Sequence, residues 1–280
     1  MPREKPQFGA ELQRALEHNK KLAKQGYVKS GGKPAYENDW TRDSSINSFG
    51  QRFFNTMPGH PTASEILKSA KPGEVIYSDM FEGNFFRNDI VRTLEKNEHK
   101  VAVELGGSGS KLFTEGFPPG TFVNTLGICL HDIRTDTEKD NDISQGHTVI
   151  EDDIMDPNND ALDQKIREVL RKDRIDLIIC SMMAPLNFLN RHPAILDRLI
   201  RKWYSWLPNN GLIFAQFRYQ GGENMEIETK IKKWADIINA THPDTIEITL
   251  DPDLSVLRLH KKPGAPDKLP AAAKIFAQAN

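Results

Sequence analysis

The pattern of hydrophobic and polar positions changes near residue 100. Beyond it, short apolar runs alternate with amphipathic segments whose apolar residues recur at helical spacing. The apolar runs predict strands, and the amphipathic segments predict helices. The strands are expected at 100–105, 122–130, 148–154, 175–181 and 211–217, and the helices at 161–172, 193–207 and 225–241. This alternation favours a parallel sheet with helices on both faces.

The last two predicted strands differ from the others. Residues 245–250 and 254–260 flank the turn residues Asp251, Pro252 and Asp253, and the second run alternates between apolar and polar positions. Two such runs joined by a short turn predict a β-hairpin. We therefore expect an α/β fold, a three-layer αβα sandwich whose seven-stranded sheet is parallel except for the strand at 254–260.

Residues 1–99 predict an N-terminal extension of helices and loops, and we expect it to cover the substrate, with segments 40–54 and 77–87 included. Helical patterns occupy 11–25 and 84–97, and Thr62 and Glu65 have the spacing of a capping box for a helix that ends near residue 70. Residues 1–35 carry eight basic and three acidic side chains, typical either of a solvated tail or of an arm that contacts an acidic partner. We expect the main domain at 100–262 and a tail at 263–280.

The composition is that of an ordinary globular protein. Among 280 residues, 37 are basic and 39 acidic, for a net charge of −2, and 38% are hydrophobic. This balance excludes wholesale disorder and argues against a uniformly basic nucleic-acid binder. The longest nearly apolar run, 177–189, is shorter than the roughly 20 residues of a membrane span, and the first residues lack the apolar core of a secretory signal. With only two cysteines, Cys129 and Cys180, we expect a cytoplasmic protein with free thiols, no membrane contact and no metal site.

The segment from 101 to 110 is the most informative about chemistry. A predicted buried strand carries the carboxylate of Glu104 near its end, and a loop of small residues follows: Gly106, Gly107, Ser108 and Gly109. Glycines let backbone amides approach a ligand closely, and the next helix would direct its positive end at the ligand. The last glycine of a dinucleotide-binding loop is missing, and Glu104 would repel a pyrophosphate. A ligand with an amine or cationic end suits this loop better.

In this motif and in the order of its predicted elements, the chain resembles the class I S-adenosylmethionine-dependent methyltransferases over residues 100–260. In that family an acidic residue and glycines end the first strand, and the loop holds the methionine part of the cofactor. The resemblance implies S-adenosylmethionine as cofactor, methyl transfer as the activity, and a sheet with the strand order 3-2-1-4-5-7-6.

Later segments resemble further motifs of the same family. In the third strand, the resemblance implies that Asp153 accepts a hydrogen bond from the adenine amine and that Ile154 packs on the ring. At the end of the fourth strand, Ser181 and Met182 would line the floor of the cofactor site.

The second strand departs from the family pattern. A carboxylate usually holds both ribose hydroxyls there, but this chain has Cys129 in that position and Asp132 three residues later. A thiol is a poor bidentate acceptor, so either Asp132 reaches the ribose or ribose recognition is weakened. The full set of expected cofactor residues is Glu104, Gly106, Gly107, Ser108, Gly109, Cys129, Asp132, Asp153, Ile154, Ser181 and Met182.

Two classes of function remain open. The first is methyl transfer, with a small-molecule acceptor favoured and a protein or RNA acceptor possible. Residues 181–185 lack the Asp/Asn-Pro-Pro-aromatic signature of exocyclic amino methylation, and neither cysteine has the neighbouring proline typical of cytosine C5 methylation. The second is a catalytically inert protein of the same fold that acts as a binding module. The sequence singles out no catalytic residue and does not predict an oligomeric state.

Overall fold

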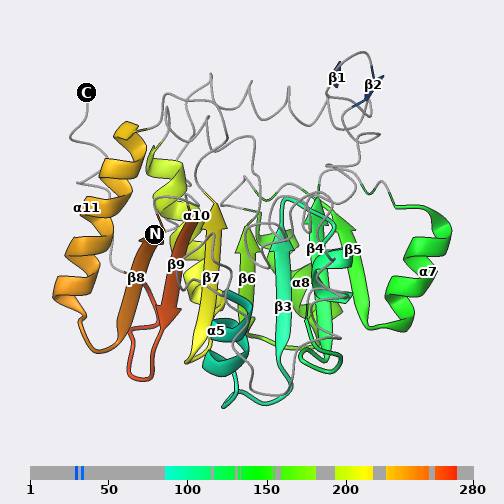
Figure 1. Cartoon of the computed structure of the whole chain (residues 1–280), viewed down its shortest axis with the longest axis horizontal. Coiled ribbons are helices and arrows are strands. Elements are labelled where there is room, and N and C mark those ends of the chain that lie inside the picture. The colour runs from blue at the N-terminus through cyan, green and yellow to red at the C-terminus, as the bar shows by residue number, and fades with distance from the viewer. Residues whose placement is uncertain are drawn as a thin grey trace, which may run out of the picture.

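The centre of the molecule is a seven-stranded sheet in the order β5-β4-β3-β6-β7-β9-β8 (Figure 1). It is seen in a computed structural model that describes residues 29–30, 33–34, 86–114, 117–129, 132, 134–152, 154, 159–180, 193–216, 225–251 and 256–269. The strands are β3 (Val101–Leu105), β4 (Asn124–Cys129), β5 (His147–Glu151), β6 (Leu177–Cys180), β7 (Gly211–Gln216), β8 (Ile246–Asp251) and β9 (Val256–Lys261). A separate two-stranded pair joins β1 (Lys29–Ser30) to β2 (Lys33–Pro34).

Within the seven-stranded sheet, every neighbouring pair is parallel except the two that β9 makes with β7 and β8. Numbered along the chain from β3, the strand order is 3-2-1-4-5-7-6. The predicted topology, with its single antiparallel strand, is therefore confirmed.

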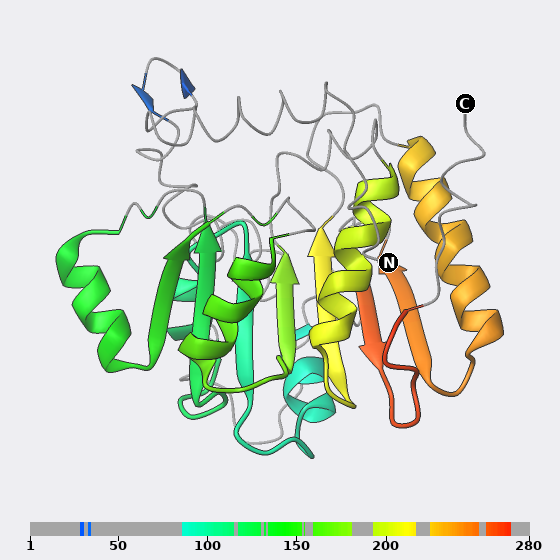
Figure 2. The ribbon, with the colours of Figure 1, turned by 180° about the vertical axis from the view of Figure 1, so that it is seen from behind.

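Helices cover both faces of this sheet, as Figures 1 and 2 show from opposite sides. On one face, α5 (Phe86–Thr93) and α6 (Ser110–Thr114) contribute to an apolar cluster with β3, β6 and β7. On the other face, α8 (Asp160–Leu170), α10 (Pro193–Trp206) and α11 (Met225–Thr241) bury a larger cluster that includes Trp203 and Trp234. The predicted three-layer αβα architecture is confirmed. Helix α7 (Asp136–Ser144) lies beyond the edge strand β5 (Figure 1).

All five residues of β3 are buried, because helices cover both of its faces. Val101, Val103 and Leu105 belong to the larger cluster, and Ala102 belongs to the smaller one. By strand alternation, Glu104 shares the face of Ala102, where its neighbour in the register on β4 is Gly127. The fold thus places a buried carboxylate beside a strand residue that has no side chain.

Some element ends differ from the predicted bounds. Strand β6 begins at Leu177 instead of residue 175, and just before it the Asp176 carboxylate accepts a hydrogen bond from the Val101 amide at 2.9 Å. Helix α8 ends at Leu170, where Arg171 adopts a left-handed conformation with φ 52°. Helix α7 has no counterpart among the predicted elements. The predicted helices at 11–25 and 62–70 lie outside the described residues.

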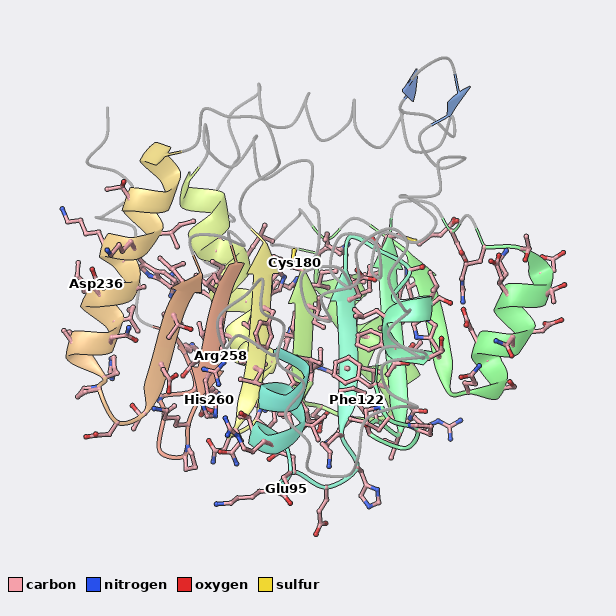
Figure 3. The ribbon with its side chains drawn as sticks, viewed as in Figure 1. Glu95, Phe122, Cys180, Asp236, Arg258 and His260 are labelled. Carbon is pink, nitrogen blue, oxygen red and sulfur yellow. The ribbon has the colours of Figure 1, made fainter. Side chains whose placement is uncertain are left out.

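Both cysteines are free, as predicted. Cys129 ends β4 and Cys180 ends β6, and β3 lies between these two strands. Figure 3 shows Cys180 at the carboxyl end of the parallel strands, opposite the end near Glu95. Among the described residues, no helix is long and apolar enough to cross a membrane.

Candidate cofactor-binding site

The glycine-rich loop leaves the carboxyl end of β3 and folds back over β4. The Gly106 amide donates a hydrogen bond to the Ile128 carbonyl at 2.8 Å, and Gly107 forms an isolated antiparallel bridge with Ile128. Gly106 and Gly109 have φ angles of 92° and 68°, a region that glycine adopts without steric cost. These backbone angles let the chain reverse direction directly above the neighbouring strand.

The Glu104 carboxylate lies directly beside this loop. The residue has no exposed surface. Its Cδ and both carboxylate oxygens lie 2.7 Å from the position that a Cβ on Gly107 would occupy. A side chain at position 107 would collide with the carboxylate, so the close approach requires glycine. The structure therefore brings together two features that the sequence motif predicts, the acidic residue and the glycine-rich loop.

Ser108, in the middle of the loop, contacts β4 and β5. Its carbonyl oxygen lies 1.8 Å from the position that a Cβ on Gly127 would take, so β4 can accommodate the loop only with a glycine there. The same carbonyl accepts a hydrogen bond from His147 Nε2 at 2.8 Å. His147 is the first residue of β5 and is fully buried. The loop is thus held by one strand through shape and by the next through a hydrogen bond.

The two hydrogen bonds of His147 define its tautomer. A carbonyl oxygen can only accept, so Nε2 carries the proton, and Nδ1 then accepts from the Thr125 hydroxyl at 2.8 Å. Burial lowers the pKa of His147 from 6.5 to about 4, despite the opposing influence of the Ser108 hydrogen bond. The imidazole is neutral at neutral pH, in the state that both bonds require.

A second polar network joins the loop to Asp132. Arg134 donates from Nε and Nη2 to the two carboxylate oxygens of Asp132, at 3.0 and 2.9 Å. Its Nη1 donates to Asp142 at 2.6 Å, and Asp142 also accepts from the Ser110 hydroxyl at 2.9 Å. The side chains of Asp132, Arg134 and Asp142 are at most 13% exposed. The Arg134 guanidinium thus connects the segment after β4 to the start of α6 through the half-buried Asp132 and the buried Asp142.

Arg134 occupies most of the acceptor capacity of Asp132. Oδ1 accepts from both the amide and Nε of Arg134, and Oδ2 accepts from Nη2. Burial favours a higher pKa for Asp132, but its hydrogen bonds to Arg134 and the guanidinium charge outweigh burial and lower the pKa. Since a carboxylate offers about four acceptor sites, this arrangement leaves Asp132 about one site, fewer than a ribose diol uses.

Of the other expected cofactor residues, the structure describes Cys129 and Ile154. Cys129 is half-buried at the end of β4, where its carbonyl accepts from the Asp152 amide at 3.0 Å. Ile154 is 9% exposed and belongs to the apolar cluster on the α8 side of the sheet. Asp153, Ser181 and Met182 lie outside the described residues. In the part of the chain that is described, no group of His, Cys, Asp and Glu side chains could hold a metal ion.

The sequence motif did not identify Gly127, Arg134, Asp142 or His147 as site residues. A glycine inside a strand often marks the close approach of another backbone, so Gly127 carried a usable signal. Arg134 is one of two basic residues between 131 and 160, a strongly acidic stretch in which an arginine favours ion pairs. His147 and Asp142 carried no comparable signal.

The sequence matches no protein-family model and no curated protein. Solved structures do match. A sugar N-methyltransferase from Streptoalloteichus sp. is 10% identical with a TM-score of 0.38, over 69% of this chain and 98% of that chain. An rRNA methylase from Streptococcus thermophilus is 12% identical with a TM-score of 0.37, over 65% and 99% of the two chains.

A third solved structure, an S-adenosylmethionine-bound amino pentose methyltransferase from Micromonospora echinaspora, is 14% identical with a TM-score of 0.30, over 52% of this chain and 59% of that chain. These likenesses concern the fold alone. The strand order of the sheet, 3-2-1-4-5-7-6, is the order that the resemblance to class I methyltransferases implies, so this resemblance is confirmed at the level of the fold.

Proposed function

We propose that this protein binds S-adenosylmethionine at Glu104 and the glycine-rich loop and transfers its methyl group to a small-molecule acceptor. The observation that carries the proposal is the Glu104 carboxylate packed against Gly107 at the carboxyl end of β3. From β3 the chain builds the sheet outward in one direction through β4 and β5, and then returns to add β6 on the opposite side of β3. The direction in which strands are added therefore reverses between β3 and β6. Open α/β sheets bind their ligands at this kind of switch point.

The Glu104 carboxylate and the glycine-rich loop suit the amino acid end of the cofactor. A carboxylate favours a nearby ammonium group, and such charge-assisted hydrogen bonds are stronger than neutral ones. Gly106 is exposed, so the loop is accessible to a ligand beside the buried Glu104. When bound, S-adenosylmethionine supplies a methyl group on a sulfonium. The contribution we assign to this chain is to bind and orient the reactants, because alignment accounts for much of the rate of a direct displacement.

We assign the remaining expected residues to the other parts of the cofactor. Asp153 and Ile154 would contact the adenine, Ser181 and Met182 would line the floor, and Cys129 would lie near the ribose. Asp132 would accept from one ribose hydroxyl, because Arg134 occupies its other acceptor sites. Residues 40–54 and 77–87 of the N-terminal extension would cover the acceptor.

Isothermal titration with S-adenosylmethionine and S-adenosylhomocysteine tests this proposal through Glu104→Gln. The variant keeps the shape of the side chain and removes its charge. A charge-assisted hydrogen bond contributes about 1.5–3 kcal/mol, so we expect affinity to fall by about ten- to a hundredfold. Product formation from candidate acceptors then tests the transfer itself.

The matched control is Asp176→Asn, which also neutralises a buried carboxylate. Asp176 is 1% exposed and accepts from the Val101 amide, at the opposite end of β3 from the loop. This variant should lose stability and keep its cofactor affinity. If both variants bind as the wild type does, the site is misplaced. If the wild type binds neither ligand, the methyltransferase proposal fails and the inert binding module is favoured.

A further inference from the structure

We propose that His147 is a positioning residue that holds the glycine-rich loop in the conformation on which cofactor binding depends. The inference rests on the proposed function for its ligand and on the structure for its geometry. His147 contacts the loop from β5, two strands away from the strand that carries Glu104. Its Nε2 donates to the Ser108 carbonyl at 2.8 Å, a connection across 39 positions of sequence.

A loop of this composition needs an external constraint. Glycine has more backbone freedom than any other residue, so a stretch with glycines at 106, 107 and 109 loses much entropy when it is ordered. If this loss occurred on binding, it would weaken the affinity for the ligand, whereas a loop that is ordered beforehand avoids the cost. The His147 hydrogen bond restrains the loop at Ser108, between two of these glycines.

The imidazole also packs against the next loop residue. A Cβ on Gly109 would lie 3.2 Å from His147 Cε1 and 3.0 Å from the ring of Phe113 in α6. His147 therefore limits the loop at two successive positions, by a hydrogen bond at Ser108 and by contact at Gly109. The Thr125 hydroxyl donates to Nδ1, the other ring nitrogen, so this hydrogen bond does not involve the loop.

Replacing His147 with glutamine or with asparagine distinguishes the roles of its two ring nitrogens. In His147→Gln the amide nitrogen can take the position of Nε2 and keep the bond to Ser108. In His147→Asn the shorter side chain can satisfy only Thr125. A neutral hydrogen bond contributes about 0.5–1.5 kcal/mol, so His147→Asn should bind S-adenosylhomocysteine about two- to tenfold more weakly, while His147→Gln should retain most of the affinity.

Thr125→Val is the matched control for a merely structural role. It removes the partner of Nδ1 and leaves the bond from Nε2 to Ser108 in place. Both Thr125→Val and His147→Asn should lower the midpoint of urea unfolding, but only His147→Asn should weaken ligand binding. Without ligand, His147→Asn should also accelerate hydrogen exchange of the amides at 106–110, and Thr125→Val should not.

These measurements separate the inference from the proposed function. Equal loss of affinity in His147→Asn and Thr125→Val, or unchanged affinity and loop exchange in His147→Asn, overturns the positioning role. If the wild type binds no S-adenosylhomocysteine, the proposed function fails. The exchange comparison on the unliganded protein still decides whether His147 holds the loop.

Discussion

The glycine-rich loop can approach the sheet closely because Gly127 of β4 has no side chain. Gly127 lies inside β4, and a Cβ there would lie 1.8 Å from the Ser108 carbonyl oxygen. In Gly127→Ala, either the loop moves away from β4 or the strand distorts. We expect a loss of more than about 2 kcal/mol in unfolding free energy and a loss of S-adenosylhomocysteine affinity, measured by urea unfolding and titration.

Gly120→Ala provides the control for that experiment. Gly120 has φ +79°, and no atom lies within 4 Å of its missing Cβ, so alanine introduces backbone strain without a collision. Such strain costs about 1–2 kcal/mol, and ligand affinity should stay at the wild-type value. If Gly127→Ala has no larger effect than Gly120→Ala, the close approach of the loop to β4 has no energetic role.

Helix α7 shows which elements the hydrophobic pattern could predict. The predicted strands and the helices α8, α10 and α11 have apolar residues that recur at strand or helix spacing and enter the core. Helix α7 has the sequence DTEKDNDIS and no apolar stripe. Its start is stabilised by a capping box, in which Thr135 and Glu138 bond each other's backbone amides, and its buried residue is the charged Asp142. A search for apolar periodicity therefore cannot detect it.

The same distinction applies to the candidate site. Glu104 and the glycine-rich loop are adjacent in sequence, so a local motif identifies them. The groups that hold the loop come from other elements, and Ser110 is separated from Asp142 by 32 positions. Their role depends on which strands and helices become neighbours, and one sequence read locally does not contain that information.

Arg134 links Asp142 of α7 to Asp132 in the segment that follows β4. In Arg134→Met, the carboxylates of Asp132 and Asp142 remain in largely buried positions without their shared cation. Removing one partner of a buried ion pair costs about 3–5 kcal/mol, and we expect about 3 kcal/mol here, because Asp132 keeps some contact with solvent. Urea unfolding measures this loss.

Lys139→Met is the comparison for Arg134→Met, since it removes a basic residue from the same segment. Lys139 lies 3.8 Å from Asp136, a fully exposed carboxylate, and exposed ion pairs contribute little. This variant should unfold close to the wild-type midpoint. Similar losses in the two variants would show that Arg134 acts only through the net charge of the acidic stretch.

For the molecule as a whole, the order of strands determines which residues can come into contact. Strand β3 lies between β4 and β6, so the loop that follows it can cross β4 and reach β5. The glycine-rich loop folds back over β4 and reaches His147 at the amino end of β5, whereas Asp132 follows the carboxyl end of β4. The buried histidine makes the contact with the loop sensitive to pH.

Folding of the protein should couple to protonation of His147. The pKa of this residue falls from 6.5 to about 4 because of burial, with Asp142, Arg134 and Asp132 as the charged groups that act on it. The unfolded chain therefore binds a proton at a pH where the folded protein does not. Its contribution to stability is fully present above pH 6.5 and decreases as the pH falls towards about 4.

The size of this effect can be measured against a variant that does not titrate. The change in pKa corresponds to about 3 kcal/mol of unfolding free energy between neutral pH and pH 4. His147→Gln keeps a donor for Ser108 and has no ionisable group, so its stability should decrease less over this range. Urea unfolding at intervals from pH 7.5 to pH 4 compares the two proteins. Parallel curves would mean that His147 titrates normally in the folded state, which is incompatible with a neutral imidazole bonded to Ser108 and Thr125.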